Sequence, residues 1–195
     1  MNNDKVFTSK RPSLIVVDDF YNDPDAVRSA ALDHHYHSDE RFFKGTRSTM
    51  PALWPWVREE FSRLVGAPIV NWMGESANGV FQKTTNADPV VYHSDSQDYA
   101  AAVYLNPNYD AGTCFWRYKD GARRFTSDMN VDPSEYTDVT NFQLLDTVAG
   151  LYNRLVIWDG TLIHSAQSYE QFVDDPRLVH LYFFNVQRPL EDVVV

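Results

Sequence analysis

Three side chains that could share one metal ion stand at two places in the sequence. His93 and Asp95 are two residues apart in the segment VVYHSD, and His164 follows an apolar run and a tight turn roughly 70 residues later. Residues i and i+2 of an extended strand point to the same face, so the imidazole and the carboxylate could reach one ion. We therefore predict a metal site formed by His93, Asp95 and His164.

Two imidazoles and one carboxylate on one side of a metal leave its other positions open to a chelating ligand and to dioxygen. This donor set is the facial triad that holds non-haem Fe(II). A His-x-Asp tripeptide alone arises by chance in many proteins, so its surroundings have to support it. The other histidines are poorer candidates. His34, His35 and His37 fall in or after a predicted helix, and His180 falls inside a predicted strand, where a core role is simpler.

The segments that would position these residues are predicted to be short strands. Runs rich in β-branched and aromatic residues are bounded by turn residues such as Asn-Ala-Asp-Pro and Asp-Gly. They cover residues 80–83, 90–93, 99–105, 113–118, 154–158 and 178–186. Many short strands separated by turns predict a β-sandwich or barrel.

Helices are predicted mainly before this β-rich region. A strand at Leu14–Val17 is followed by Asp23, a helix-capping residue, and by Pro24, which suits the first helical position. A second helix is predicted from Trp54 to Val65, and a helical insert from Asp132 to about Leu145. The expected fold is mainly β, with N-terminal helices and one helical insert.

The order of these pieces resembles a known family. After the His-x-Asp segment come Tyr104-Leu105-Asn106, the turn Asp110-Ala111-Gly112, an apolar strand ending in Trp-Asp-Gly, His164, and Arg177 thirteen residues later. This pattern resembles the double-stranded β-helix (jelly roll, cupin-like) core of the Fe(II)/2-oxoglutarate oxygenases. It is closest in style to their prolyl-hydroxylase-like branch, and within it to small bacterial or phage proteins of undefined substrate. The resemblance covers roughly residues 80–186.

The resemblance implies a role for five residues. His93, Asp95 and His164 would bind Fe(II), and Arg177 would pair with the distal carboxylate of the co-substrate 2-oxoglutarate, for which its planar fork is suited. The Tyr104 hydroxyl would support the same carboxylate, and O2 would be the oxidant. The plain alternatives are a surface arginine at a strand end for Arg177 and a core aromatic for Tyr104.

The sequence departs from the family pattern at two places. The family often has two glycines before the strand that follows Tyr-Leu-Asn, where this chain has Ala111-Gly112. A serine or threonine often lies two or four residues beyond the arginine, where this chain has Val179 and Leu181. The contacts to the co-substrate are therefore expected to differ, and a variant 2-oxo acid is an open alternative.

The expected activity is oxidation of a small molecule, an amino acid or a peptide side chain, with release of succinate and CO2. Because related halogenases lack the carboxylate ligand, Asp95 favours hydroxylation, while desaturation stays open. Two other classes are alternatives: a jelly-roll binding module without redox chemistry, and a cupin-like metal enzyme that uses no 2-oxoglutarate. Arg177 argues against the first, and the single histidine near position 93 argues against the second.

Substrate contacts are less defined by the sequence. The stretch 41–48 carries cations beside aromatics, so it forms either a lid that holds an anionic group or a surface loop, and the loop is the preferred interpretation. Asp98, Tyr99, Trp116 and Arg117 fall on or near predicted core strands and are candidates to line the pocket. Trp54, Trp56 and Trp72 are expected to pack.

Composition limits the remaining classes. At 195 residues the chain fits one domain, residues 1–195, and its formal net charge of −10 argues against nucleic-acid and membrane-surface binding. A basic group at Lys119, Arg123 and Arg124 is expected to be a solvated loop. One cysteine, no signal-peptide-like N-terminus and no long apolar run together predict a cytoplasmic protein. The sequence does not indicate an oligomeric state.

Overall fold

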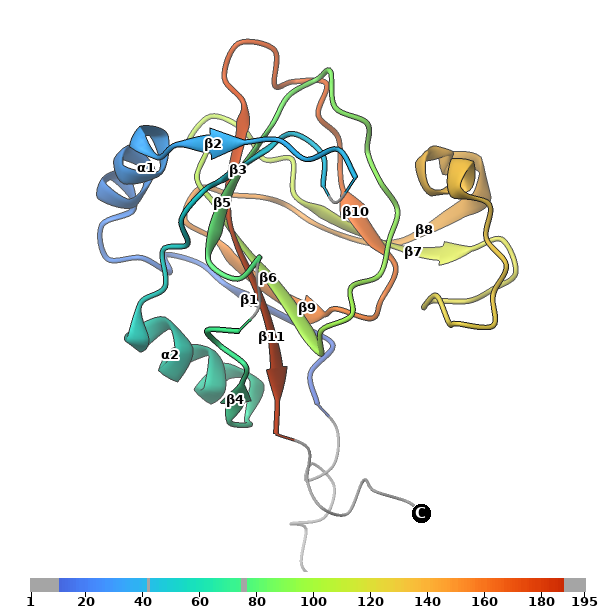
Figure 1. Cartoon of the computed structure of the whole chain (residues 1–195), viewed down its shortest axis with the longest axis horizontal. Helices are drawn as coiled ribbons and strands as arrows, with labels where there is room; N and C mark the ends of the chain where they lie inside the picture. The colour runs from blue at the N-terminus through green and yellow to red at the C-terminus, as the bar shows by residue number, and fades with distance from the viewer. Residues whose placement is uncertain (1–10, 42, 75–76, 188–195) are drawn as a thin grey trace, which may run out of the picture.

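Two antiparallel β-sheets face each other in this chain, and the computed structural model describes residues 11–41, 43–74 and 77–187 (Figure 1). The larger sheet has the strand order β1-β9-β6-β11-β5-β3-β2, with β4 also paired to β11, and the smaller sheet has the order β10-β7-β8. The strands of the larger sheet are β1 Leu14–Val17, β2 Tyr36–His37, β3 Thr46–Ser48, β4 Ile69–Val70, β5 Val80–Thr84, β6 Tyr99–Tyr104, β9 Leu155–Asp159 and β11 Arg177–Val186. Those of the smaller sheet are β7 Thr113–Tyr118, β8 Phe142–Val148 and β10 His164–Ala166.

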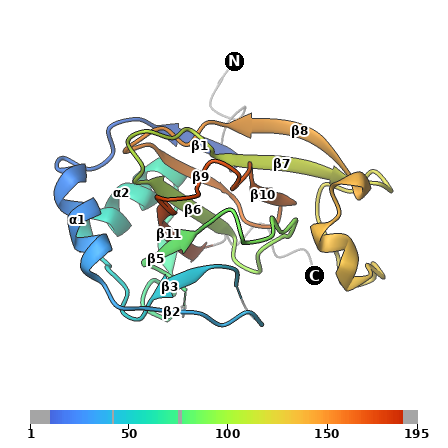
Figure 2. The ribbon, with the colours of Figure 1, turned by 90° about the horizontal axis from the view of Figure 1, so that it is seen from above.

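Both predicted N-terminal helices are present. Helix α1 spans Pro24–Asp33, and the Asp23 carboxylate accepts a hydrogen bond from the Ala26 N–H at 2.9 Å. Helix α2 spans Pro55–Val65. Figures 1 and 2 show both helices on the side of the molecule away from the β7–β8 hairpin.

The two faces of the larger sheet bury different sets of side chains, because successive strand residues point to opposite faces. The outer face meets the helices in a core that includes Phe61 of α2 with Leu178, Tyr182 and Phe184 of β11. The inner face meets the smaller sheet in a second cluster that includes Phe115, Trp158 and Val179. The alternation along β11 places Arg177 on the inner face together with Val179, Leu181 and Phe183.

Two predicted elements differ from the structure. Residues 90–93 form no strand, and only His93 is bridged, to His164, because this segment meets the smaller sheet at one position. The insert opens at Pro133, as predicted, but as two short 3-10 helices, Pro133–Thr137 and Val139–Asn141. From Phe142 the chain is the strand β8, since its pairing along β7 outweighs the local helical pattern.

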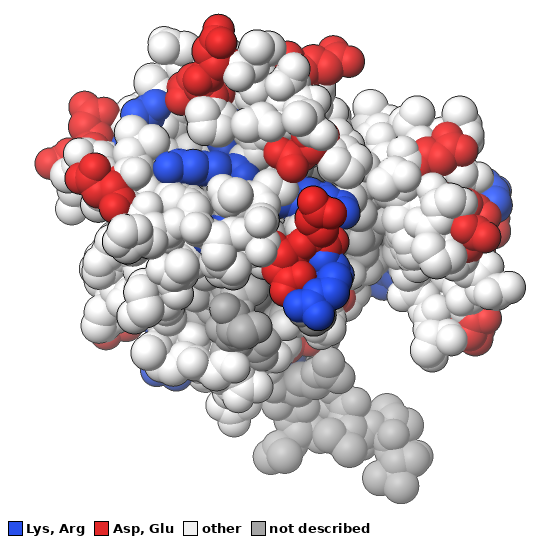
Figure 3. Space-filling view, turned by 45° about the horizontal axis from the view of Figure 1, so that its top comes forward, with Lys and Arg blue, Asp and Glu red and all other residues white. Residues whose placement is uncertain are grey.

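The surface carries few concentrated positive charges on the face that Figure 3 shows. Acidic side chains are spread over it, and the basic ones form small groups beside acids. The segment between β7 and β8 stands out from the body with a hollow between them. None of the helices in the described ranges is long and apolar enough to cross a bilayer. Residues 1–10, which include most of the N-terminal segment from which the sequence predicts no signal peptide, lie outside the described ranges.

Candidate metal centre

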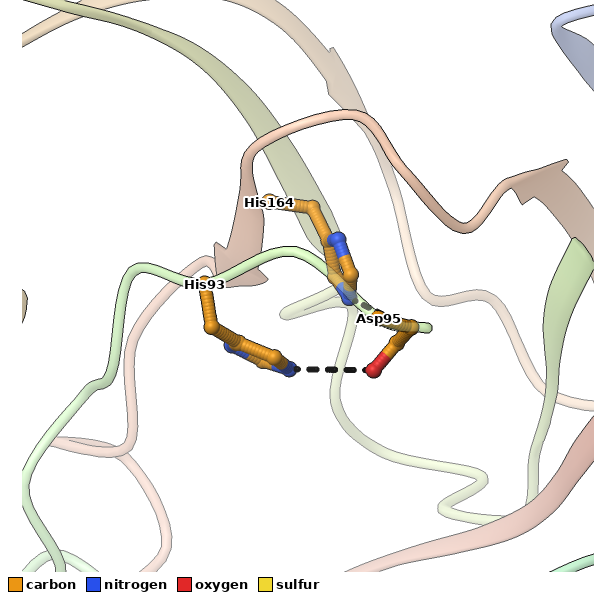
Figure 4. A group of neighbouring side chains, drawn as sticks. All are labelled: His93, Asp95 and His164. Atoms are coloured by element: carbon orange, nitrogen blue, oxygen red, sulfur yellow. Dashed lines mark ion pairs between the residues drawn. The ribbon is translucent and has the colours of Figure 1, made fainter. Parts of the chain in front are cut away.

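The three predicted ligand residues converge at one point of the structure (Figure 4). One potential donor atom from each of His93, Asp95 and His164 lies within 4.8 Å of the others. The Nε2 atom of His93 is 3.7 Å from Asp95 Oδ1, and that of His164 is 3.3 Å from Asp95 Oδ2. Ligands at right angles around a metal with bonds of about 2.1 Å are roughly 3 Å apart, so these separations suit a shared ion.

Backbone pairing brings the two histidines together. The His93 N–H donates to the His164 carbonyl at 3.0 Å, and the His164 N–H donates to the His93 carbonyl at 2.8 Å. This reciprocal pair places the ring centroids 4.4 Å apart. The loop before β6 is therefore tied to β10 at the residue that carries the first imidazole.

The hydrogen bonds of both imidazoles leave the same nitrogen available. His93 Nδ1 lies 3.1 Å from the Val91 carbonyl, and His164 Nδ1 lies 2.8 Å from the Leu162 carbonyl. A carbonyl oxygen only accepts, so each neutral ring carries its proton on Nδ1 and keeps a lone pair on Nε2. Both lone pairs face Asp95, as in metal-binding histidines that a second partner holds in one tautomer.

Asp95 is the third member, and it lies deeper than His93, whose side chain is 45% exposed against 13% for Asp95. Its Oδ2 atom is buried and has no well-formed hydrogen bond within the described part of the chain. Burial alone would raise the pKa of Asp95, but His164, His93 and Arg47 outweigh it and leave that pKa below its ordinary value. A buried, ionised carboxylate oxygen without a donor fits a cation at this point.

Gly160 allows the segment of Asp95 to approach β9. The Asp95 N–H donates to the Gly160 carbonyl at 2.7 Å. A Cβ atom at position 160 would lie 2.6 Å from the Gln97 carbonyl oxygen, a contact that real side chains do not make. The glycine of the Trp-Asp-Gly turn is thus required for the distance between Asp95 and His164.

Arg177 is buried on the inner face at the start of β11, so the alternative of a surface arginine is wrong. Its guanidinium lies 5.4 Å from the centre of the Tyr104 ring and 6.0 Å from that of Tyr169. Its hydrogen bonds to the Ala111 and Gly112 carbonyls are long, at 3.5 Å each. Within the described ranges no carboxylate lies within 4.0 Å of it, so its charge lacks an acidic partner.

Tyr104 lies beside Arg177 with its hydroxyl 2.7 Å from Thr113 Oγ1. Burial raises the pKa of Tyr104, although Arg177 acts in the opposite direction, so the phenol stays neutral. Arg154, immediately before the strand that precedes His164, is held by Asp18 at 2.6 and 3.0 Å. Arg177, unlike Arg154, is therefore available to an incoming anion.

The two departures from the family pattern have local explanations. A Cβ atom at Gly112 would lie 1.8 Å from the Val148 carbonyl oxygen, so the second glycine of the pair is the one that the geometry requires. Ala111 in the first position is accommodated and buried. The missing hydroxyl on β11 has a counterpart on β5: Thr84 is the strand partner of Arg177. The Oγ1 atom of Thr84 is buried near the Tyr169 hydroxyl, but it has no well-formed hydrogen bond.

Of the other residues that the sequence suggested near the pocket or in a basic loop, one is not where it was expected. Tyr99 belongs to the outer core and donates to the Pro12 carbonyl, so it does not line the inner face. Trp116 is near the site, with its Nε1–H donating to Ser165 Oγ at 2.9 Å. Lys119 and Arg124 pair with Glu135 and Asp159, in agreement with a solvated basic loop.

Arg47 lies in the stretch 41–48, for which the sequence favours a surface loop, so the sequence does not predict it at the site. Part of that stretch is instead the strand β3, which pairs with β5 in the larger sheet. Burial lowers the pKa of Arg47 to about 10, while Asp95 and Tyr169 act to raise it. Arg47 in turn acts on the pKa of His93 and of Asp95, so it lies beside the metal centre.

Comparison with known proteins finds a shared fold and no close relative. No family model and no curated protein matches the sequence. HygX from Streptomyces hygroscopicus, solved with nickel, 2-oxoglutarate and hygromycin B bound, is similar at 14% identity over 93% of this chain and 86% of that one, with a TM-score of 0.60. AviO1 from Streptomyces viridochromogenes Tue57 is similar at 11% identity over 88% of each chain, with a TM-score of 0.54. The chain shares the fold of these two proteins, which confirms the jelly-roll fold predicted from its sequence.

Proposed function

We propose that this protein is an Fe(II)- and 2-oxoglutarate-dependent oxygenase that hydroxylates a small molecule, an amino acid or a peptide side chain. The observation that carries the proposal is the convergence of two Nε2 lone pairs and one buried carboxylate oxygen on a single point. The shared fold supports it, because HygX was solved with both a divalent metal and 2-oxoglutarate bound.

In this proposal His93, Asp95 and His164 hold the ferrous ion on one side and leave its remaining positions open. The bound iron would couple the oxidation of 2-oxoglutarate by O2, to succinate and CO2, to the insertion of one oxygen atom into a substrate C–H bond. The carboxylate of Asp95 occupies the position that a halide would need, so hydroxylation is favoured over halogenation.

The residues on the inner face hold the co-substrate. Arg177 is a buried cation with no carboxylate within 4.0 Å among the described residues, and it would pair with the distal carboxylate of 2-oxoglutarate through two parallel hydrogen bonds. Tyr104 and Thr84 would add hydroxyl groups to that carboxylate from β6 and β5. The outer face of β11, which carries Leu178, is packed against the helices, so the co-substrate would bind between the two sheets.

The proposal is tested by anaerobic titration of the Fe(II)-loaded protein with 2-oxoglutarate, followed by the weak visible charge-transfer absorption of the chelate. We expect saturation at one equivalent in the wild type and no absorption in His164→Ala. Arg177→Met should keep the iron and weaken 2-oxoglutarate by roughly 10- to 100-fold, the loss expected for a charge-assisted pair.

The matched control is Arg63→Met on α2, an exposed arginine that pairs with Glu60 and lies on the far side of the outer core. It should bind 2-oxoglutarate like the wild type. Iron binding without the visible absorption would refute the co-substrate and favour a cupin-like metal enzyme. Failure to bind iron would favour a binding module.

A further inference from the structure

Arg47 is a second inward-facing cation, on β3 beside the metal centre. It lies on β3, opposite Gln82 of β5, which in turn lies opposite Val179 on the inner face of β11. The register therefore places Arg47 in the same row as Gln82, Val179 and Tyr104, between the sheets. Its neighbours confirm the direction, since its guanidinium carbon lies 5.9 Å from the centre of the Phe183 ring.

The guanidinium is oriented but has no acidic partner. Its Nε–H donates to Gln82 Oε1 at 3.0 Å, and the ring of Phe43 lies 4.6 Å from its central carbon. In the described ranges this is its one hydrogen bond to a side chain, and no carboxylate comes within 4.0 Å. The two terminal nitrogens are thus left as a fork between two phenyl rings.

The charges around the site remain unbalanced when 2-oxoglutarate is bound. A divalent iron, Arg47, Arg177 and the single carboxylate of Asp95 leave three positive charges, and a dicarboxylate removes two of them. The other acid nearby is Asp88, whose oxygens already accept from the Gly45 and Thr85 N–H groups. An uncompensated cation in a partly buried site is costly, so one further anionic group is expected there.

We propose that Arg47 binds an oxyanion of the substrate, a carboxylate or a phosphate, with the adjoining apolar part of the substrate packed against Phe183. The proposal rests on the proposed function, since the substrate is taken to share the site with iron and 2-oxoglutarate. It assigns the two arginines different ligands: Arg177 holds the co-substrate, and Arg47 selects the substrate by its negative charge. Neutral and cationic compounds of the same shape would then be poor substrates.

The test uses the Fe(II)- and 2-oxoglutarate-loaded protein under anaerobic conditions and four probes: phenylacetate, its neutral analogue phenylacetamide, phenyl phosphate and inorganic phosphate. Binding is measured by calorimetry. We expect at least one of the two aromatic anions to bind at least 10-fold more tightly than phenylacetamide. Which anion binds more tightly distinguishes a carboxylate from a phosphate, and inorganic phosphate shows how much the ring adds.

Arg47→Met should lose this preference by at least 10-fold, and Arg47→Lys, which keeps the charge without the fork, should lose only part of it. Arg63→Met is the control and should bind all four probes as the wild type does. The 2-oxoglutarate titration is repeated on each variant.

If wild-type protein does not bind 2-oxoglutarate, the proposed function fails. If it does, but no anion is preferred over phenylacetamide or Arg47→Met retains the preference, the role of Arg47 is refuted. Loss of 2-oxoglutarate binding in Arg47→Met would make Arg47 a co-substrate anchor and also refute it.

Discussion

Histidine side chains lie on both sides of the larger sheet, His180 in the outer core and His93 and His164 at the metal centre, and their nitrogens are satisfied in opposite ways. On the outer face His180 has a partner at both nitrogens: Nε2 lies 3.0 Å from the Gly79 carbonyl, and Nδ1 lies 2.8 Å from the Tyr21 hydroxyl. At the metal centre, His93 and His164 each have a carbonyl at Nδ1 and direct Nε2 at a carboxylate. The fold thus occupies both nitrogens of His180, whereas it leaves the Nε2 atoms of His93 and His164 facing a carboxylate, as a metal ligand requires.

The largest effect is expected from removing a ligand of the metal centre. His164→Ala or Asp95→Ala should weaken Fe(II) binding by more than about 100-fold, since losing only the second partner of a metal ligand already costs 10- to 100-fold. Iron content and affinity after reconstitution measure this. The matched control, His35→Ala, changes an exposed histidine outside the cluster and should bind iron normally. Unchanged iron binding in both variants would refute the role of His164 and Asp95 as metal ligands and with it the contrast to His180.

His180→Ala should have the reverse outcome. It removes a fully buried ring from an aromatic cluster and leaves the Tyr21 and Tyr182 hydroxyls to pair only with each other. We expect the free energy of unfolding to fall by about 3 kcal/mol from the cavity and the lost hydrogen bonds. Urea denaturation measures the loss, and iron stoichiometry should stay unchanged. Loss of iron at unchanged stability would contradict a structural role.

The pH dependence of stability should sharpen the same distinction. Burial lowers the pKa of His180 to about 3, so the folded state binds fewer protons here than the unfolded state, where the pKa is about 6.5. Its contribution to stability is complete above about pH 6.5 and declines as the pH falls toward 3, by up to about 1.4 kcal/mol per unit. Urea denaturation of the metal-free wild type and of His180→Asn at several pH values isolates it. The difference in the free energy of unfolding between the two proteins should become smaller as the pH falls. A difference that does not change with pH would argue against a buried neutral imidazole.

The smallest effect is expected from Tyr104→Phe. This change removes one hydroxyl from the inner face and keeps the ring beside Arg177. A hydrogen bond of about 1 kcal/mol corresponds to a loss of roughly 5-fold in 2-oxoglutarate affinity. Iron affinity should not change, and the anaerobic titration measures both quantities. Unchanged 2-oxoglutarate affinity would leave Tyr104 as a core aromatic that positions Arg177.

The strands and the residues on them could be predicted from the sequence where the pattern is local. The strand at Thr113–Tyr118 has the predicted bounds, and α1 begins at the residue after its predicted cap. His93, Asp95 and His164 were identified by residue type, order and spacing, and the structure brings them together. Their function as iron ligands stays a prediction until the metal is measured.

What the sequence could not indicate depends on pairing between distant segments. Arg47 became part of the site only because β3 pairs with β5, and nothing in the stretch around it marks an inward direction. Thr84 likewise stands opposite Arg177 through the β5–β11 register. The segment after Asn141 resembles a helix by itself, and its pairing along β7 makes it a strand.

The reciprocal backbone pair between His93 and His164 has a thermodynamic consequence. It joins positions roughly 70 residues apart through only two hydrogen bonds, in a loop that forms no strand of its own. An ion held by both side chains would bind the folded state, in which the two segments lie together, and not the unfolded chain, in which they are apart. The melting temperature should therefore rise with the logarithm of free metal, by an amount equivalent to about 2.7 kcal/mol at 100 times the dissociation constant. The concentration of free metal would then set the thermal stability of the protein as well as the occupancy of the site.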